Sequence, residues 1–411
     1  MATGSVQSEK VTFTGSLGDT LAARLDRPIG PIRAYALFAH CFTCSKDIFA
    51  ASRIAGAMAE RGIAVLRFDF TGLGMSEGDF ANTNFSSNVA DLVAAANYLR
   101  DEHEAPRILV GHSLGGAAVL AAASDVPEAV AVATIGAPST AHHVSDSFAS
   151  DIATIESEGE AEVVLAGRPF KIKKQFLEDI AETTLNGKIA SLKKALIVFH
   201  APRDQQVSVD NAADIFMAAK HPKSFVSLDD ADHLLTRKQD AIYVADVLSA
   251  WASRYLPERA HANLLPLEEG KVTVEETGAG KFQHLVRIGD HELFADEPKK
   301  VGGDDTGLAP YDLLLAGLGA CTSMTMRLYA ARKGLKATKF GVTLSHNKVH
   351  ADDCEECAAE GSQKIDVISR EISIEGDLTD AERAKLMEIA NKCPVHRTLE
   401  SDIEVLTRLK A

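Results

Sequence analysis

One serine lies in a pattern that suits nucleophilic catalysis. The segment GHSLG (residues 111–115) overlaps the end of an apolar run at 107–112 and precedes an alanine-rich, helix-like run. A serine hydroxyl becomes a good nucleophile only when a base removes its proton. A sharp turn from strand to helix exposes such a hydroxyl, the glycines permit the turn, and the first helical amides can stabilise an oxyanion. We therefore predict that Ser113 is a nucleophile; the alternative is a serine that caps a helix in a glycine-rich turn.

A serine nucleophile needs a histidine base and a carboxylate that orients the base, in the expected chain order serine, acid, histidine. Asp204 follows the apolar run 195–201, and His233 follows the run 224–230. Both positions lie at the ends of predicted strands, where doubly wound sheets keep their sites. We predict Asp204 as the acid and His233 as the base. Three rival acids are too close to His233 in sequence to come from a separate strand end: Asp229, Asp230 and Asp232.

Four of the six cysteines form two Cys-x-x-Cys pairs, Cys41 with Cys44 and Cys354 with Cys357. Such a pair can be a redox couple, half of a zinc site, or a structural feature. A zinc site built from both pairs would need them in one compact unit, whereas they lie in opposite halves of the chain. The acidic segment around Cys354 and His350 could attract a cation weakly, but a loop of solvated charges is the simpler interpretation. We predict no metal and no cofactor.

The other two cysteines have different surroundings. Cys321 lies in an apolar, helix-like segment beside Gly317 and Gly319, and such small residues let another backbone or a ligand approach closely. Cys393 ends a second predicted helix, because Pro394 cannot continue it. From these contexts alone both are most simply buried structural thiols, since cysteine is among the residue types most often buried.

The composition is that of an ordinary globular protein, with 46% hydrophobic and 25% charged residues in a chain of 411. A net charge of −15 would repel nucleic acid phosphates and anionic membranes, so we expect small molecules as partners, with no nucleic acid and no membrane. The first residues lack the apolar segment of a signal peptide, and the longest apolar run is shorter than a membrane span. We therefore predict a cytoplasmic protein, in which the cysteines are free thiols.

The first part of the chain alternates between apolar runs and helix-like segments such as 49–62 and 88–101. Continuous apolar runs are typical of parallel strands that are buried on both faces. The alternation predicts an α/β domain at 1–255, built on a doubly wound sheet. The apolar runs fall at 35–40, 64–70, 107–112, 131–137, 195–201 and 224–230.

A stretch with two prolines and mixed charges follows this domain, and we place a linker in it at 256–264. The remaining domain, 265–411, has strands and helices segregated along the chain, as in an α+β fold. A long apolar helix is predicted at 310–334, and a second helix begins at Thr379, where the segment TDAE forms a capping box. Strands are predicted at 271–277, 283–289, 291–297, 337–349, 364–376 and 403–409.

Residues 10–255 resemble the α/β-hydrolase family. The resemblance lies in the turn that carries Ser113, in Asp204 and His233, and in the segment RFDFTGLGMSEG (67–78), which such enzymes have after the fourth strand. The glycines of that segment do not have the spacing of a phosphate-binding loop. The resemblance implies a serine hydrolase in which these three side chains cleave an ester.

The family also lends two backbone amides to an oxyanion hole. The resemblance assigns these to Phe42, in the segment HCFTC after the third strand, and to Leu114, which follows the nucleophile. Cys41 stands where glycine is usual. Cys41 and Cys44 are then interpreted as small buried residues beside the serine site, and a redox pair that controls the hydrolase is the alternative. An insertion at about 140–190 is expected to form a small lid over the acyl pocket.

Residues 265–411 resemble the OsmC/Ohr family through the segments PYDLLLAGLGAC, ending at Cys321, and CPVHRTL, beginning at Cys393. Its better-known members reduce organic hydroperoxides. The resemblance therefore implies that Cys321 attacks the peroxide and that Cys393 resolves the sulfenic acid as a disulfide, which a dithiol reductant then reduces. A thiolate needs a cationic neighbour, and we expect Arg287, with the nearby acid Asp312, to activate the thiol. The resemblance also implies a homodimer.

We therefore expect a serine-dependent carboxylic ester hydrolase fused to an OsmC-like thiol domain that reduces organic hydroperoxides. The alternative is that the OsmC-like domain is a non-catalytic platform for dimerisation or ligand binding. A third hypothesis is that the hydrolase acts on products of peroxide damage, such as oxidised acyl esters. The sequence does not identify the physiological ester.

Overall fold

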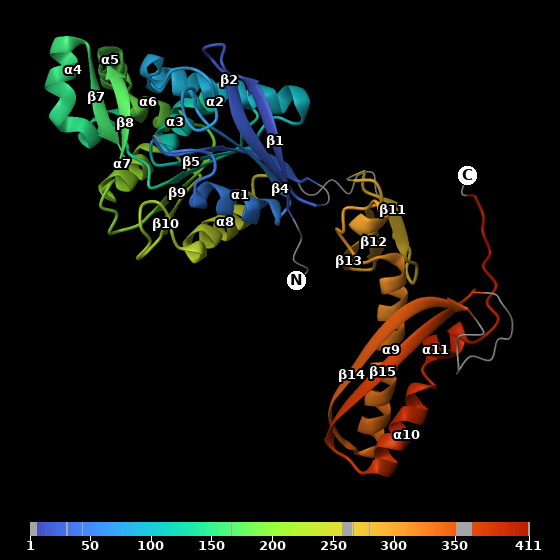
Figure 1. Ribbon diagram of the computed structural model, residues 1–411. Helices are drawn as coiled ribbons and strands as arrows, with labels where there is room; N and C mark the ends of the chain where they lie inside the picture. The colour runs from blue at the N-terminus through green and yellow to red at the C-terminus, as the bar shows by residue number, and fades with distance from the viewer. Residues whose placement is uncertain are drawn as a thin grey trace. The chain divides into compact units, whose positions relative to one another are not determined.

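The computed structural model describes residues 6–29, 32–42, 44–165, 167–256, 265, 267–278, 280–350 and 364–409. By its internal contacts the chain divides into two units, Met1–Pro266 and Leu267–Ala411 (Figure 1). The predicted fold class is confirmed. A mostly parallel sheet packed with helices forms the first unit, and antiparallel strands with a long helix form the second.

An eight-stranded sheet forms the centre of the first unit. Its order is β1-β2-β4-β3-β5-β6-β9-β10, with β4 to β10 parallel and with β1 and β2 added antiparallel at one edge. Helices connect the parallel strands, as a doubly wound sheet requires. The strands are β1 (Gln7–Thr14), β2 (Thr20–Arg27), β3 (Ala34–Ala39), β4 (Ile63–Phe68), β5 (Ile108–His112), β6 (Ala131–Ile135), β9 (Ala195–His200) and β10 (Lys223–Ser227).

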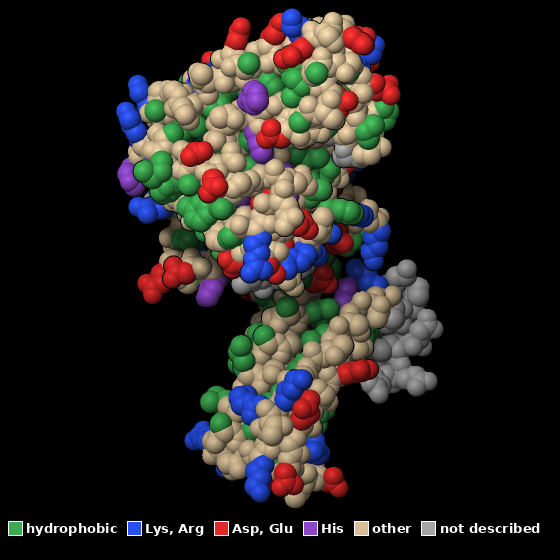
Figure 2. Space-filling model, turned by 90° about the vertical axis from the view of Figure 1, so that its left-hand side faces the viewer, with side chains coloured by type: hydrophobic (Ala, Val, Ile, Leu, Met, Phe, Trp, Pro, Cys, Tyr) green, Lys and Arg blue, Asp and Glu red, His purple; other side chains and the backbone are tan. Residues whose placement is uncertain are grey.

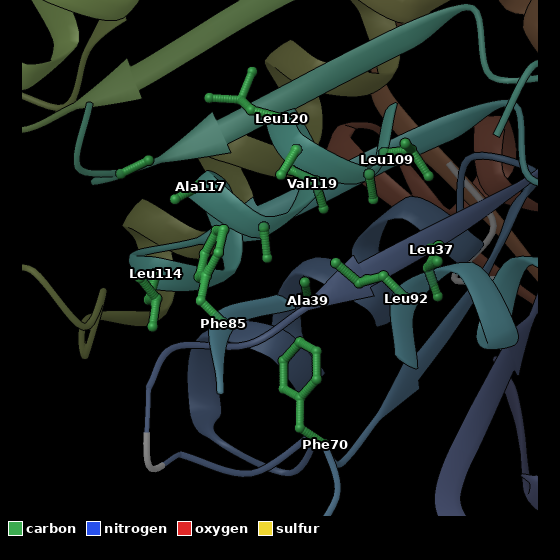
Figure 3. Close-up of a cluster of buried hydrophobic side chains, with 14 of the residues drawn as sticks. Leu37, Ala39, Phe70, Phe85, Leu92, Leu109, Leu114, Ala117, Val119 and Leu120 are labelled. Carbon is green, nitrogen blue, oxygen red and sulfur yellow. The ribbon is translucent and has the colours of Figure 1, made fainter. Parts of the chain in front are cut away.

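Successive side chains of each central strand enter two different hydrophobic cores. In β3, Leu37 packs in the core that contains α2 and α3, whereas Phe38 packs in the opposite core against α1 and α8. Figure 3 shows the first core, where Leu37, Leu92 and Leu109 lie close together. Burial on both faces explains why these strands are continuous apolar runs in the sequence. The helices are α1 (Phe49–Ala59), α2 (Phe85–Glu102), α3 (Leu114–Ala122), α7 (Asp210–Ala218) and α8 (Lys238–Ala252), with short 3₁₀ turns η1 (Phe80–Asn82) and η2 (Ala123–Asp125).

The chain between β6 and β9 forms the insertion that was predicted at about 140–190. It contains an antiparallel hairpin, which was not predicted, between short helices. Phe176 of this insertion packs against Phe42, with 5.6 Å between the ring centroids, and Phe170 packs against Phe80 at 5.0 Å. The insertion is therefore packed on the loop that follows β3. Its elements are η3 (Ala141–Asp151), α4 (Ile152–Glu158), β7 (Glu160–Leu165), β8 (Arg168–Lys173), α5 (Lys174–Glu182) and α6 (Leu185–Ala190).

The second unit has a three-stranded antiparallel sheet, β11-β12-β13, and a long antiparallel pair, β14-β15, that packs with α9 and α10. The capping box predicted at Thr379 is present, with Glu382 as its partner. The shared core is small and contains Met326, Ala330 and Leu386. The elements are β11 (Thr273–Glu276), β12 (His284–Ile288), β13 (His291–Ala295), η4 (Lys299–Val301), α9 (Pro310–Lys333), β14 (Lys336–His350), β15 (Lys364–Asp377), α10 (Asp380–Ala390) and α11 (Pro394–Leu399).

Helix α9 is apolar on the face that packs and on the face that does not. Met324 and Leu328 are 70% and 72% exposed, and Figure 2 shows hydrophobic side chains at the surface of the second unit. By length and composition α9 could cross a membrane, with a mean hydropathy of 1.2 in its most apolar window. Its opposite face nevertheless packs on β14 and α10, so in this structure it is the central helix of its unit.

Two expectations for the second unit are wrong. The strand predicted at 403–409 has no regular secondary structure, and Val405 and Leu406 are 83% and 79% exposed. A strand needs a neighbouring strand to accept and donate its backbone hydrogen bonds, and within the described chain this segment pairs with none. The second helix ends at Ala390 rather than at Cys393, which instead caps α11 with Pro394 as its first residue.

Candidate active site

The turn that carries Ser113 forms where β5 ends and α3 begins. Ser113 has a φ of 56°, a positive value that is uncommon for a residue with a side chain. Backbone hydrogen bonds hold the turn, from the Ser113 amide to the Ile135 carbonyl and from the Gly116 amide to the Ser113 carbonyl, both at 2.8 Å. Strain of this kind persists only where the surroundings enforce it, and here it places the hydroxyl at the edge of a cavity.

Two glycines let neighbouring backbone pass close to this turn. A Cβ on Gly111 would lie 2.2 Å from the carbonyl oxygen of Gly115. A Cβ on Gly115 would lie 2.4 Å from the carbonyl oxygens of Ala39 and His40, at the end of the adjacent strand β3. No side chain fits at either distance, so the pattern of glycines around the serine is a packing requirement of this sheet.

The side chains of Ser113, His233 and Asp204 form a hydrogen-bonded chain. His233 Nε2 lies 3.0 Å from Ser113 Oγ, and His233 Nδ1 lies 2.7 Å from Asp204 Oδ2. Asp204 follows β9 and His233 follows β10, so both come from loops at the carboxyl ends of the strands. The three rival acids are engaged elsewhere: Asp229 with Ser227, Asp230 with Arg237, and Asp232 with Thr236.

Asp204 is buried but well supplied with donors. The amides of Gln206 and Val207 donate to its Oδ1 at 2.8 and 3.0 Å. Burial acts to raise the pKa of Asp204, but the hydrogen bonds from His233 and these amides outweigh burial, so its pKa lies below the ordinary value. A charged Asp204 accepts the Nδ1 proton of His233, which leaves Nε2 free to take the proton of Ser113.

The two amides expected to bind an oxyanion, those of Phe42 and Leu114, belong to residues that line the same cavity as Ser113. Neither amide donates a hydrogen bond within the part of the chain that the structure describes. The loop that carries Phe42 is anchored by a buried ion pair, in which the amide and the ammonium of Lys46 donate to Asp69 at 2.5 and 2.7 Å. Both amides are therefore available to a developing oxyanion.

Cys41 and Cys44 border the same cavity, as small residues beside the serine site were expected to do. The expectation that they are free thiols is wrong, because the structure joins them in a disulfide. The Cys44 amide donates to the Cys41 carbonyl at 3.1 Å, which tightens the loop and brings the two Cα atoms to 5.3 Å. That separation is within the usual range for a disulfide. The bridge encloses Phe42, whose amide is one of the two oxyanion donors.

The cavity next to Ser113 has a volume of about 270 Å³. The insertion between β6 and β9 supplies one wall, which includes the apolar residues Val144, Val164 and Leu165. Polar groups come from His143 and Gln206. The insertion thus has the position that was expected of a lid, and its wall combines these apolar side chains with the polar His143 and Ser147.

A second cluster of reactive side chains lies where α9 meets α10 and β15. Arg370 donates to Thr322 Oγ1 at 2.9 Å, and Thr322 Oγ1 lies 3.6 Å from Cys393 Sγ. Burial raises the pKa of the Cys393 thiol, but Thr322, the His396 amide, the neighbouring Cys321 thiol and the charge of Arg370 outweigh burial. The pKa of Cys393 therefore lies below its ordinary value.

The residues predicted to activate the thiol are not in this cluster. Arg287 pairs with Glu275 at 2.7 Å in the three-stranded sheet, and the Asp312 carboxylate accepts from the Ala309 amide as the cap of α9. Arg370 was missed, although it stands on the face of β15 that also carries Ile372 and Ile374 toward α9. A charged residue on the inward face of a strand was the available signal.

Cys354 and Cys357 lie outside the described residues. Among the residues that the structure does describe, no group of three or more His, Cys, Asp or Glu side chains is arranged to hold a metal ion.

His112, between Gly111 and Ser113, gives the site a testable dependence of stability on pH. Burial, with a smaller contribution from His233, lowers the pKa of His112 from 6.5 to about 4. Between these values the unfolded chain binds a proton at this position and the folded unit does not. The free energy of unfolding should therefore fall as the pH drops from 6.5 toward 4, by about 1.4 kcal/mol per pH unit from this group.

The variant His112→Gln should have a correspondingly shallower loss of stability in that window. Urea unfolding followed by the fluorescence of Trp251 measures it, because this is the only tryptophan in the chain and lies in the first unit. His142→Gln, at an exposed position, is the control and should keep the wild-type slope. Equal slopes for wild type and His112→Gln would contradict a buried neutral His112.

The doubly wound sheet and the chain of serine, histidine and aspartate at its strand ends define a serine hydrolase site. Residues 36–301 match the alpha/beta hydrolase family, and the chain belongs to this family. Residues 302–408 match the OsmC-like proteins, so the second unit carries an OsmC-like domain. The hydrolase match extends over β11–β13, but by their contacts these strands belong to the second unit, since β13 bridges to Leu308 just before α9.

Known proteins similar to the first unit include esterases and a thioesterase. The esterase domain of a Rhodothermus marinus protein is 49% identical, with a TM-score of 0.51, and the match covers 61% of this chain and all of that domain. Alpha/beta hydrolase domain-containing protein 10 from mouse shares the fold at 20% identity and a TM-score of 0.51, over 60% of this chain and 99% of that chain. The rat mitochondrial palmitoyl-protein thioesterase ABHD10 is 40% identical over 89 residues, or 22% of this chain. The match spans 29% of that rat protein and 33% of its mouse counterpart.

Proposed function

We propose that the first unit is a serine-dependent hydrolase of carboxylic esters. The observation that carries the proposal is the hydrogen-bonded chain from Asp204 through His233 to Ser113, at the edge of a cavity. His233 takes the proton as Ser113 attacks the ester carbonyl, and the amides of Phe42 and Leu114 stabilise the oxyanion. His233 then protonates the leaving alcohol, and water releases the acid from Ser113 in a second, equivalent step.

The cavity supports small acyl groups as substrates. Its volume of about 270 Å³ is slightly below the usual range for small-molecule sites, about 300–1,000 Å³. Val144 and Leu165, from the insertion, offer apolar contacts to an acyl chain, and the ring of Phe42 borders the same space. An oxygen ester and a thioester present the same carbonyl to Ser113, so the proposal includes both.

A series of p-nitrophenyl esters with acyl chains of increasing length tests this function. We expect hydrolysis of the acetate and butyrate and a fall in kcat/KM for the octanoate and palmitate, because the longer chains exceed the volume of the cavity. A butyryl thioester should also be cleaved. The absence of hydrolysis for all of these substrates would contradict the proposal, and a preference for palmitate would contradict the size argument.

For the second unit we propose reduction of an organic hydroperoxide. Cys321 borders an open, mostly apolar depression of about 390 Å³ together with Met324 and Leu328, whereas Cys393 is fully buried next to it. The Cys321 thiolate attacks the terminal oxygen of the hydroperoxide and the O–O bond breaks, so Cys321 becomes a sulfenic acid. The remaining alkoxide takes a proton and leaves as an alcohol. The Cys393 thiol then forms a disulfide with Cys321 and releases water, and a dithiol reductant restores both thiols.

Consumption of cumene hydroperoxide by the full chain with a dithiol reductant checks this activity. The wild type should turn over, Cys321→Ser should lose turnover, and Cys393→Ser should stop after one equivalent per chain. Arg370→Met should turn over about tenfold more slowly than the wild type, because it removes the positive charge beside the two thiols. Turnover that persists in Cys321→Ser would contradict the assignment.

The exposed apolar face of α9 favours a second candidate role for this unit, as a dimerisation platform. Met324 and Leu328 are largely exposed, and the extended segment 403–409 pairs with no strand of the described chain. A homodimer would bury such a face. The mass of the full chain in solution tests it, and a monomer at micromolar concentration would contradict the platform.

A further inference from the structure

A buried histidine stands at or directly after the end of three central strands of the sheet. His40 directly follows β3, His112 is the last residue of β5, and His200 is the last residue of β9. Their exposed fractions are 1%, 0% and 0%. They stand at the edge of the sheet where the loops of the candidate active site begin. None of the three belongs to the chain of Ser113, His233 and Asp204.

Each of these histidines donates one ring N–H to a backbone carbonyl in a different loop. His40 Nδ1 lies 2.7 Å from the carbonyl oxygen of Cys41, and His112 Nε2 lies 2.7 Å from that of His233. His200 Nε2 lies 2.8 Å from the carbonyl oxygen of Val207. Because a carbonyl only accepts, the bonded nitrogen must carry the proton in each case. The tautomer is Nδ1–H in His40 and Nε2–H in the other two.

The second ring nitrogen of each histidine has no hydrogen-bond partner among the described residues: His40 Nε2, His112 Nδ1 and His200 Nδ1. His40 Nε2 is 4.0 Å from Asp69, beyond hydrogen-bond distance. A buried polar atom without a partner destabilises the fold, and an apolar residue of similar size would avoid that cost. Burial also favours the neutral form of the rings, since it lowers the pKa of all three. Packing alone therefore does not explain three histidines here.

The three carbonyls belong to the three parts of the proposed hydrolytic site. Cys41 precedes Phe42, whose amide is an oxyanion donor. The second carbonyl is that of His233, the base itself, and its ring lies against the ring of His112, with centroids 5.4 Å apart. The third belongs to Val207, whose amide donates to Asp204.

From this arrangement we infer that His40, His112 and His200 are positioning residues. Each ties one catalytic loop to the end of its strand, so that the oxyanion donor, the base and the acid keep a fixed geometry. The inference rests on the proposed hydrolase function. It assigns no contact with substrate to these histidines, since all three are buried beneath the loops.

Asparagine and glutamine variants of each histidine test this inference. The decisive result is which of the two amides retains kcat at each position, not how much kcat is lost. The side-chain amide of asparagine occupies the place of histidine Nδ1, and that of glutamine occupies the place of Nε2. At His40 we expect asparagine to retain kcat and glutamine to lose it. At His112 and His200 we expect the reverse, glutamine retaining kcat and asparagine losing it. The expected loss is about 10–100-fold in kcat with little change in KM, as for a misplaced catalytic group.

The measurements are kcat and KM for p-nitrophenyl butyrate and the rate at which an aryl phosphonofluoridate labels Ser113, each with Trp251 fluorescence as a check on folding. The same order of asparagine and glutamine at all three positions would overturn the inference, because a packing role depends on size alone. So would equal kcat values for both amides at each position. His142→Asn and His142→Gln, at an exposed site, should match the wild type.

The labelling rate separates this inference from the proposed function. If the wild type is labelled at Ser113 but hydrolyses no ester, the proposed activity fails, while the order of the variants in labelling still decides the role of the histidines. If the wild type hydrolyses esters and the order is absent, the inference fails and the function stands. A wild type that is neither labelled nor active would overturn both.

Discussion

Replacing Ser113 with alanine should lower kcat for ester hydrolysis by about four orders of magnitude or more. The change removes the nucleophile, and His233 and Asp204 act on the substrate only through it. The serine hydroxyl is 3.0 Å from His233 Nε2, and its loss leaves the base with no proton to take. The free energy of unfolding should change little, since alanine tolerates the same turn about as well as serine. Hydrolysis of p-nitrophenyl butyrate and the urea unfolding of Trp251 measure the two effects.

Ser147→Ala is the matched control for this prediction. Ser147 lines the same cavity but is exposed and lies outside the chain of hydrogen bonds. Its variant should keep kcat close to the wild-type value. Activity of Ser113→Ala within tenfold of the wild type would remove Ser113 from the mechanism, and an equal loss in Ser147→Ala would indicate that the cavity as a whole had been disturbed.

The second large effect is on folding. Gly115→Ala should lower the free energy of unfolding by about 3 kcal/mol, the upper part of the range for overpacking. Its new Cβ would lie 2.4 Å from the carbonyl oxygens of Ala39 and His40, and both are backbone atoms that cannot move without displacing β3 from α3. The same displacement would separate the oxyanion loop from Ser113, so kcat should fall as well. Urea unfolding of the full chain, followed at Trp251, measures the change.

Gly56→Ala serves as the control for that substitution. Gly56 lies inside α1 of the same unit, and a Cβ there would meet nothing within 4 Å. Alanine favours a helix over glycine by about 1 kcal/mol, so this variant should be as stable as the wild type or more stable. A Gly115→Ala variant as stable as Gly56→Ala would show that the strand and helix are not packed as closely as described.

Much of the first unit could be predicted because most of its strands are continuous apolar runs in the sequence. Five of the six parallel strands are buried at every residue, and their sequences are therefore continuous apolar runs that stand out from the segments between them. The sixth, β10, lies at the edge of the sheet and is only partly buried. The hairpin β7-β8 was missed, because its strands are short and half exposed and alternate weakly. The strand expected at 403–409 was wrong for another reason. The segment is apolar, but a strand forms only where a neighbouring strand shares its backbone hydrogen bonds. The sequence does not show whether such a neighbour is present.

The candidate site could likewise be predicted only in part. Ser113, Asp204 and His233 each follow a recognisable strand, so the order of the chain was enough to place them at one edge of the sheet. The disulfide between Cys41 and Cys44 could not be foreseen, since a Cys-x-x-Cys pair is compatible with free thiols, a metal site or a bridge. Nor could the surroundings of Cys393, because Arg370 is linked to it through Thr322, and that link depends on how β15 lies against α9.

The three strand-end histidines show a further limit of sequence interpretation. A histidine at the end of an apolar run is usually structural, and nothing in the local sequence of His40 or His200 distinguishes it from such a residue. Their shared feature is a hydrogen bond from the ring to a backbone carbonyl of the loop that follows the strand, that of Cys41 for His40 and that of Val207 for His200. Only the three-dimensional arrangement shows that these bonds end on the oxyanion loop and on the loop of the acid.

The most direct test of the central claim, that Ser113 is an activated nucleophile, is covalent labelling of the full chain with an aryl phosphonofluoridate followed by mass spectrometry. The serine oxygen displaces fluoride from phosphorus, so each chain gains one phosphonyl group and releases hydrogen fluoride. We predict a single label, located on the peptide that contains Ser113, that is lost in Ser113→Ala and strongly slowed in His233→Gln. A wild type that stays unlabelled, or a label that persists in Ser113→Ala, would contradict the account.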